Sequence, residues 1–121
     1  MPTFRRFEDI DAWKKARILT KEIYLMTSTT GFSRDFRLRD QIRRSTVSIS
    51  ANIAEGQGRR SDREFANFVN IALGSLAETK SHQYMALDLK FINQKQFQEI
   101  YGKLDEVGRM TFGLCKHLRK K

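Results

Sequence analysis

Arginine side chains are concentrated in the central part of this chain. Residues 34–63 contain eight arginines and four acidic residues, and eight minus four leaves a net charge of +4 over this segment. A guanidinium group donates several hydrogen bonds in a planar fork, which matches the oxygens of a phosphate. The pattern indicates phosphate contacts. The candidate residues fall into three groups: Arg34, Arg37, Arg39 and Arg43; then Arg59, Arg60 and Arg63; then Lys116, Arg119, Lys120 and Lys121.

The first of these groups stands against its local preference. Arg34, Arg37 and Arg39 lie at the expected N-terminal end of a helix, where a cation opposes the helix dipole. Cations at a position that does not stabilise the helix indicate another role, such as phosphate binding. The whole chain carries a net charge of +9, which also favours a polyanionic partner. A basic surface that is only solvated is the competing interpretation.

A second pattern is a polar seam that begins at residue 41. Its members are Gln41, Arg44, Ser48, Asn52 and Glu55 on one helix, with Gly74, Ser75 and Glu78 on the next. The first five follow steps of three and four residues, so they share one helix face. We expect Arg44 to pair with Glu78 inside the bundle or at its edge, and Gly74 to let the backbones approach closely.

No residue pattern typical of an enzyme is present. His82 and His117 are 35 residues apart on different expected helices, and neither has a cysteine or glutamate partner at metal-ligand spacing. Cys115 lacks a partner nearby in the sequence, and the glycines of residues 56–58 form too short a loop to cradle a phosphate. We therefore expect no catalytic residues, no metal ligands and no cofactor.

Apolar residues recur at steps of three and four along nearly the whole chain, which is typical of amphipathic helices. The expected helices cover about residues 8–28, 35–55, 62–92 and 93–118, with a turn at residues 32–35. There is no alternating pattern typical of strands. Four such helices with short connections predict an all-α, antiparallel up-down-up-down four-helix bundle, formed as a single domain by residues 1–121.

The expected helix ends carry their own signals. Gly56 is placed to cap the C-terminal end of the second helix. Ser61 with Glu64 has the spacing of a capping box for the third helix, and Asn93 with Gln96 has the same spacing for the fourth.

Composition limits the setting in which this chain works. A single cysteine excludes an internal disulfide bond and fits a reducing compartment. The sequence has no secretory signal and no apolar run near the ~20 residues that a membrane span needs. We expect a cytoplasmic location and no membrane partner. The apolar faces are wider than one seam for each helix, which indicates either a wide core or self-association.

Several motifs resemble one known family. Ser48-Ile-Ser-Ala-Asn-Ile-Ala-Glu-Gly56 and Ile71-Ala-Leu-Gly-Ser-Leu-Ala-Glu78 are similar to motifs of the proteins encoded in intervening sequences of large-subunit ribosomal RNA genes, also called S23 ribosomal proteins. Phe7-Glu-Asp-Ile-Asp-Ala-Trp-Lys-Lys-Ala16 and Leu38-Arg-Asp-Gln-Ile-Arg-Arg44 match as well. The resemblance spans essentially the whole chain. It implies a four-helix bundle that assembles as a homopentamer, without an established activity.

The sequence leaves two functions open. The first is a non-catalytic, homo-oligomeric bundle that binds nucleic acid through its basic groups. RNA is preferred because a more distant relative, the accessory protein of diversity-generating retroelements, works with a reverse transcriptase and RNA. The second is a protein–protein adaptor that docks another protein, such as a polymerase or reverse transcriptase. Salt separates the two, because phosphate binding weakens steeply as salt is added.

Overall fold

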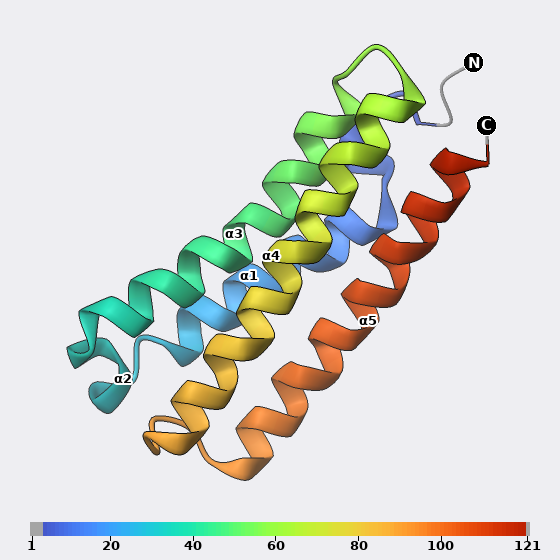
Figure 1. Ribbon diagram of the computed structural model, residues 1–121. Coiled ribbons are helices and arrows are strands. Elements are labelled where there is room, and N and C mark those ends of the chain that lie inside the picture. Colours follow the sequence, from blue (N-terminus) through green and yellow to red (C-terminus); the bar gives the residue numbers. More distant parts are fainter. Residues whose placement is uncertain (1–3, 121) are drawn as a thin grey trace.

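The computed structural model describes residues 4–120, and its regular elements over that range are all helical (Figure 1). In order they are the short 3-10 helix η1 (Phe7–Asp9) and the α-helices α1 (Asp11–Met26), α2 (Thr30–Arg34), α3 (Phe36–Gln57), α4 (Asp62–Asp88) and α5 (Gln94–Arg119). The four long helices alternate in direction along the chain (Figure 1). This confirms the predicted antiparallel four-helix bundle.

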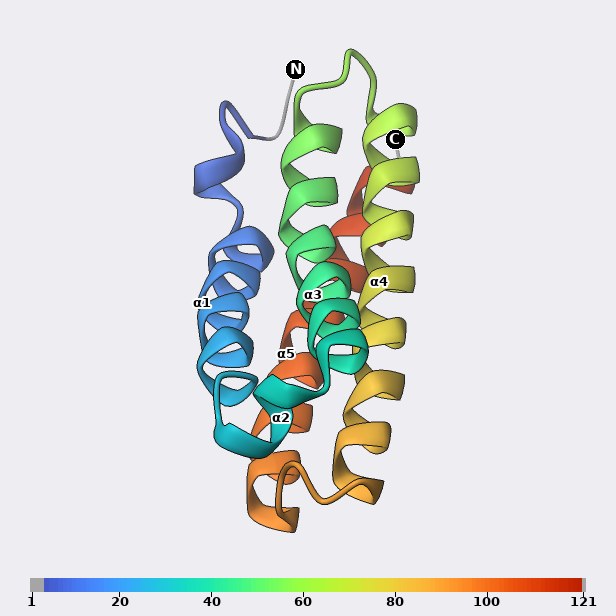
Figure 2. The ribbon, with the colours of Figure 1, turned by 90° about the vertical axis from the view of Figure 1, so that its left-hand side faces the viewer.

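The four long helices surround one apolar core. Helix α3 packs against both α1 and α4, and α5 closes the ring by packing against α4 and α1 (Figure 2). The predicted apolar stripes supply this core. The stripe of α1 is buried at all its members, Ala12, Ala16, Leu19, Ile23 and Met26. The stripe of α5 is buried in the same way, from Phe97 to Leu118.

The segment before α3 differs from the prediction. The first helix begins at Asp11 because Ile10 is extended, with φ −84° and ψ 118°. Residues 30–34, expected in part as a turn, form the short helix α2. Phe32 anchors it in the core, with its ring centroid 5.3 Å from that of Phe91. The burial of one aromatic ring thus holds a helix that has too few residues to be stable alone.

Gly56 does not cap α3 as expected. The helix continues to Gln57, and Gly56 is buried in its last turn. A Cβ at Gly56 would lie 2.8 Å from Cβ of Phe68 and 2.9 Å from Cδ1 of Phe65. The glycine is therefore required by the close approach of α4, because any side chain would collide with it.

Both predicted N-cap side chains cap their helices, and of the two predicted capping boxes the one at Asn93 is complete. Ser61 Oγ accepts a hydrogen bond from the Glu64 amide at 3.2 Å. Asn93 and Gln96 form a complete capping box, with each side chain accepting from the other residue's amide.

Helix α4 ends at Asp88, four residues earlier than predicted. Lys90 has φ 61°, in the left-handed region. The Phe91 amide then donates to the Ala86 carbonyl at 2.9 Å, and the Lys90 amide donates to the Leu87 carbonyl at 3.0 Å. These two bonds form a Schellman motif, with lysine at the position that glycine usually occupies.

Candidate nucleic-acid interface

Two of the three basic groups lie at the same end of the bundle. The α3–α4 connection and the C-terminal end of α5 meet there (Figure 1). Arg63 and Arg119 line one groove of about 220 Å³, which Asp62, Ala66 and Leu118 complete. We call this surface the basic end; it consists of Arg59, Arg60, Arg63, Lys116, Arg119 and Lys120. Lys121, predicted with this group, lies outside the described residues.

The cations of the basic end differ in how far they are already engaged. The Arg59 guanidinium pairs with Glu55 at 3.0 Å and lies 4.5 Å from the Phe68 ring centroid. Lys116 lies 5.7 Å from the Phe112 ring centroid. The remaining four are exposed and form no ion pair within residues 4–120: Arg60, Arg63, Arg119 and Lys120. These four are the most accessible to an anion.

The first basic group lies at the opposite end of the bundle. Helix α3 separates the two ends by about 33 Å, since its 22 residues rise about 1.5 Å each. Arg34 and Arg37 are exposed there. Arg39 is engaged, because its Nε donates to Asp40 at 3.0 Å and its Nη1 donates to the Ser33 carbonyl at 3.3 Å. The structure therefore does not join this group to the basic end.

Arg43 was predicted as a phosphate ligand, but the structure gives it internal partners. Its Nε donates to the buried Thr27 hydroxyl at 2.7 Å. Its Nη2 donates to Ser28 Oγ at 3.2 Å and to the Tyr24 carbonyl at 3.4 Å, and the guanidinium lies 4.5 Å from the Tyr24 ring centroid. These contacts join α3 to the C-terminal end of α1, where a positive charge is favourable. We therefore remove Arg43 from the interface.

The polar seam is present between α3 and α4, but hydroxyl groups form its interior. Ser75 Oγ donates to Ser48 Oγ at 2.9 Å, and Asn52 Nδ2 donates to the same hydroxyl at 2.9 Å. One turn along, the buried hydroxyls of Ser45 and Thr79 are 2.7 Å apart. We call these five residues the hydroxyl ladder. Their bonds satisfy polar groups that the helix contact shields from water.

The predicted ion pair and close contact within this seam are wrong for the single chain. Arg44 and Glu78 are exposed, and Glu78 contacts His82 at 3.2 Å instead. A Cβ at Gly74 would meet no heavy atom within 4 Å. The reason is rotational: Ser45 and Thr79, one position further round each helix, face the partner helix, so Arg44 and Glu78 point outward. Gln41 and Glu55 are exposed as well.

The outer face of α1 holds a basic surface that the prediction missed. Trp13, Lys14, Arg17, Ile18 and Lys21 surround a groove of about 440 Å³. We call these five residues the α1 groove. Lys14, Arg17 and Lys21 are spaced by three and four residues, so the helix places them on one side. That spacing is the sequence signal for this surface, and it lies outside the arginine-rich residues 34–63.

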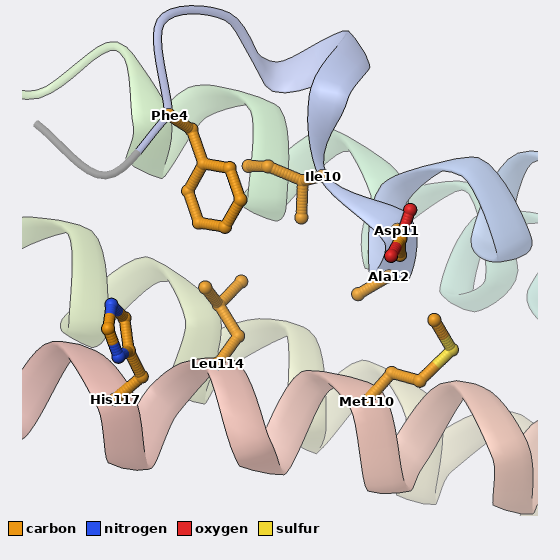
Figure 3. A pocket seen from close by; sticks show the side chains of 7 residues that line it. All are labelled: Phe4, Ile10, Asp11, Ala12, Met110, Leu114 and His117. Atoms are coloured by element: carbon orange, nitrogen blue, oxygen red, sulfur yellow. The ribbon is translucent and has the colours of Figure 1, made fainter.

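A separate cavity of about 400 Å³ lies between the start of α1 and the end of α5. Its walls are mostly apolar, from Phe4, Ile10, Ala12, Met110 and Leu114. Figure 3 shows its two ionisable side chains, Asp11 and His117, on opposite sides of the cavity. The cavity does not bring this acid and this base together around a common point, as a general acid–base pair would require.

One shifted pKa is found at the α4–α5 surface. The charge that Tyr101 acquires on ionisation and a hydrogen-bonding contact with Tyr101 raise the pKa of Tyr84 above its ordinary value of 10.0. The Lys80 ammonium group acts in the opposite direction, and it pairs with Asp105 at 2.6 Å. The raised pKa keeps Tyr84 protonated at neutral pH, and its ring packs edge-on against that of Tyr101 at a centroid distance of 5.9 Å.

Over residues 4–120, no group of three or more histidine, cysteine or acidic side chains is arranged to hold a metal ion. None of the helices in that same range is both long and apolar enough to cross a bilayer.

Comparison with known proteins identifies the relatives of this chain. Residues 8–113 match the family model described as 23S rRNA-intervening sequence protein. A crystal structure of a protein of unknown function from the S23 ribosomal protein family of Bacteroides thetaiotaomicron superposes with a TM-score of 0.79. The two chains share 26% sequence identity, over 87% of this chain and 98% of that one. No curated protein matches. Because the family model covers most of the chain, this protein belongs to the 23S rRNA-intervening sequence protein family.

Proposed function

We propose that this protein is a non-catalytic, self-associating helical bundle that binds nucleic acid, with RNA preferred, at its basic end. The observation that carries the proposal is the meeting of residues 59–63 with residues 116–120 at one end of the molecule, where Arg63 and Arg119 line one groove. Four exposed cations of this end form no ion pair within residues 4–120, so they can approach phosphates without losing an internal partner.

The expected binding mode is electrostatic. Phosphate contacts release condensed counterions, so the logarithm of the association constant falls linearly with the logarithm of salt concentration, by about 0.7 for each phosphate contacted on a single strand. Contacts to phosphates carry no sequence information, so we expect weak sequence preference.

Self-association is the second part of the proposal. Val47 on α3 and Ile71 on α4 are 41% and 52% exposed, on the two helices that the hydroxyl ladder joins. Gly74 leaves open space on the same helix as Ile71. An apolar, small-residue surface of this kind suits close contact with a second copy of the chain. The family resemblance favours five copies, which would repeat the basic end five-fold.

The adaptor function is supported by a different surface. Tyr84, Met85 and Leu89 at the end of α4 are all about half exposed. They lie at the end of the bundle remote from the basic end, so a protein partner could dock there through apolar contacts. Such binding would change little with salt.

A neutralising triple variant tests the nucleic-acid proposal. Arg60→Gln/Arg63→Gln/Arg119→Gln should weaken binding of single-stranded RNA and reduce the magnitude of the salt slope by about 2, since three contacts contribute about 0.7 each. The matched control is Lys90→Gln/Lys95→Gln/Arg109→Gln, which removes the same charge from exposed residues outside the basic end.

Three outcomes are informative. Loss of affinity confined to the basic-end variant supports the proposal. Equal, small losses in both variants would show that only the net charge of the chain matters. Absence of RNA binding by the parent protein, together with salt-insensitive capture of a polymerase, would favour the adaptor function.

Self-association is tested by light scattering. The parent protein should give a mass several times the 14.2 kDa of the chain. Ile71→Glu should lower this mass, while Leu89→Glu, which changes an equally exposed residue at the C-terminal cap of α4, should not. A parent protein that is monomeric at every concentration would refute this part of the proposal.

A further inference from the structure

The α1 groove combines positive charge with an aromatic ring. Lys14, Arg17 and Lys21 span seven residues of α1, which is about 10 Å along the helix axis. All three are exposed. Lys14 pairs with Asp11 at 3.7 Å, and within residues 4–120 the other two cations form no ion pair. Arg17 and Lys21 therefore carry charges that nothing in the described chain neutralises.

Trp13 forms the aromatic wall of this groove. Its ring is half-buried, with one edge contact to Phe7 at a centroid distance of 4.9 Å and an interplanar angle of 66°. The Arg17 guanidinium lies 5.8 Å from the Trp13 ring centroid. Ile18, 54% exposed, adds an apolar side chain to the lining of the groove. The indole is held in place by the core side of the bundle, and part of it faces the groove.

These features fit one class of ligand better than others. A duplex buries its base faces in the stack, whereas a single strand can present a base to an aromatic ring while its phosphates contact nearby cations. A free anion would use the charge of the groove but not its indole or isoleucine. An acidic protein segment would use the charge but would gain less from a flat aromatic surface.

We infer that the α1 groove is a second contact site for single-stranded RNA, in which Lys14, Arg17 and Lys21 bind consecutive phosphates and a base stacks on Trp13. This rests on the proposed function, because it extends RNA binding from the basic end to the outer face of α1. It also adds an indole on which an unpaired base can stack, which favours unpaired over paired strands.

The chain provides its own reporter for this site. Trp13 is the single tryptophan of the protein, so intrinsic tryptophan fluorescence arises from the α1 groove alone. The probe is a single-stranded oligoadenylate, followed in two titrations. Fluorescence anisotropy of end-labelled RNA measures binding anywhere on the protein. Tryptophan emission with unlabelled RNA measures contact at the groove.

We expect tryptophan emission to be quenched with the same midpoint as the anisotropy change. Lys14→Gln/Arg17→Gln/Lys21→Gln should weaken binding about tenfold or more and reduce the salt slope by about 2, since three phosphate contacts contribute about 0.7 each. The control Lys90→Gln/Lys95→Gln/Arg109→Gln should change affinity much less. Trp13→Phe, which keeps a ring against Phe7, should weaken binding while leaving the salt slope unchanged, because stacking releases no counterions.

The outcomes separate this inference from the proposed function. An anisotropy change with unaltered tryptophan emission, and equal affinities for the groove variant and the control, would overturn the inference while RNA binding at the basic end stands. Absence of any anisotropy change would overturn both. Equal quenching by an oligoadenylate and by a perfectly paired duplex would also overturn the stacking assignment, because paired bases cannot reach the indole.

Discussion

Two glycines of the same bundle should respond in opposite ways to the same substitution. Gly56 and Gly74 both lie inside helices, and in each case alanine would favour the helix by about 1 kcal/mol. They differ in what surrounds them. Gly56 is buried against α4, while a Cβ at Gly74 would meet no heavy atom within 4 Å.

The cost at Gly56 follows from the atoms that its new methyl group would meet. The nearest is Cβ of Phe68 at 2.8 Å, which cannot move unless the α4 backbone moves, and the Phe65 carbonyl oxygen is at 3.1 Å. Overpacking of this kind costs about 1–3 kcal/mol, and a fixed neighbour places it near the upper value. Subtracting the gain in helix propensity leaves Gly56→Ala less stable than the parent by about 2 kcal/mol. Gly74→Ala should instead be more stable by about 1 kcal/mol.

Urea unfolding followed by circular dichroism measures both changes. The midpoint should fall for Gly56→Ala and rise for Gly74→Ala, with the slope of free energy against urea unchanged. Several protein concentrations are needed, because the proposed self-association would add to apparent stability. A Gly56→Ala variant as stable as the parent would refute the packing argument, since it would mean that α4 yields at no cost.

Three further substitutions test particular contacts. Arg43→Met should lower the unfolding free energy by about 1.5–3 kcal/mol in urea unfolding, because it removes charge-assisted hydrogen bonds, whereas the exposed control Arg44→Met should change it by less than about 0.5 kcal/mol. Lys90→Gly should raise the melting temperature. Glycine relieves about 1–2 kcal/mol of left-handed strain, and this exceeds the about 0.4–1 kcal/mol of stability lost because glycine makes the unfolded chain more flexible. Tyr101→Phe should bring the pKa of Tyr84 back towards 10.0 in a phenolate absorbance titration. Because the raised pKa means that the folded chain holds this proton more tightly, the contribution of Tyr84 to stability declines as pH rises above 10.0, and the variant should lose that decline.

The fold could be predicted from the sequence because burial sets the helical period. The apolar periodicity of residues 8–28 and 93–118 predicts α1 and α5, since an apolar side chain on the wrong face of a long helix would be exposed in every turn. The short helix α2 was missed. It depends on Phe32 meeting Phe91, a contact between segments far apart in the chain that no local pattern records.

The candidate site was less predictable because it depends on how helices are rotated against each other. A shift of one position decides whether Arg44 or Ser45 faces α4, and helical spacing alone does not fix that rotation. In the same way, nothing local separates Arg43, which contacts three residues of the α1 end, from the exposed Arg37. The bundle topology brings residues 59–63 and 116–120 to one surface. Because successive helices alternate in direction, the start of α4 and the end of α5 lie at the same end of the bundle.

The hydroxyl ladder gives α3 and α4 a fixed alignment that an apolar contact would not. Sliding one helix past the other by a full turn, about 5.4 Å, would return apolar residues to similar surroundings but would break the bonds among Ser45, Ser48, Ser75 and Thr79. The hydroxyl ladder therefore fixes the position of α3 along α4. Substitutions on the outward surface of the two helices can change the chemistry of that surface without shifting the spacing between Val47 and Ile71.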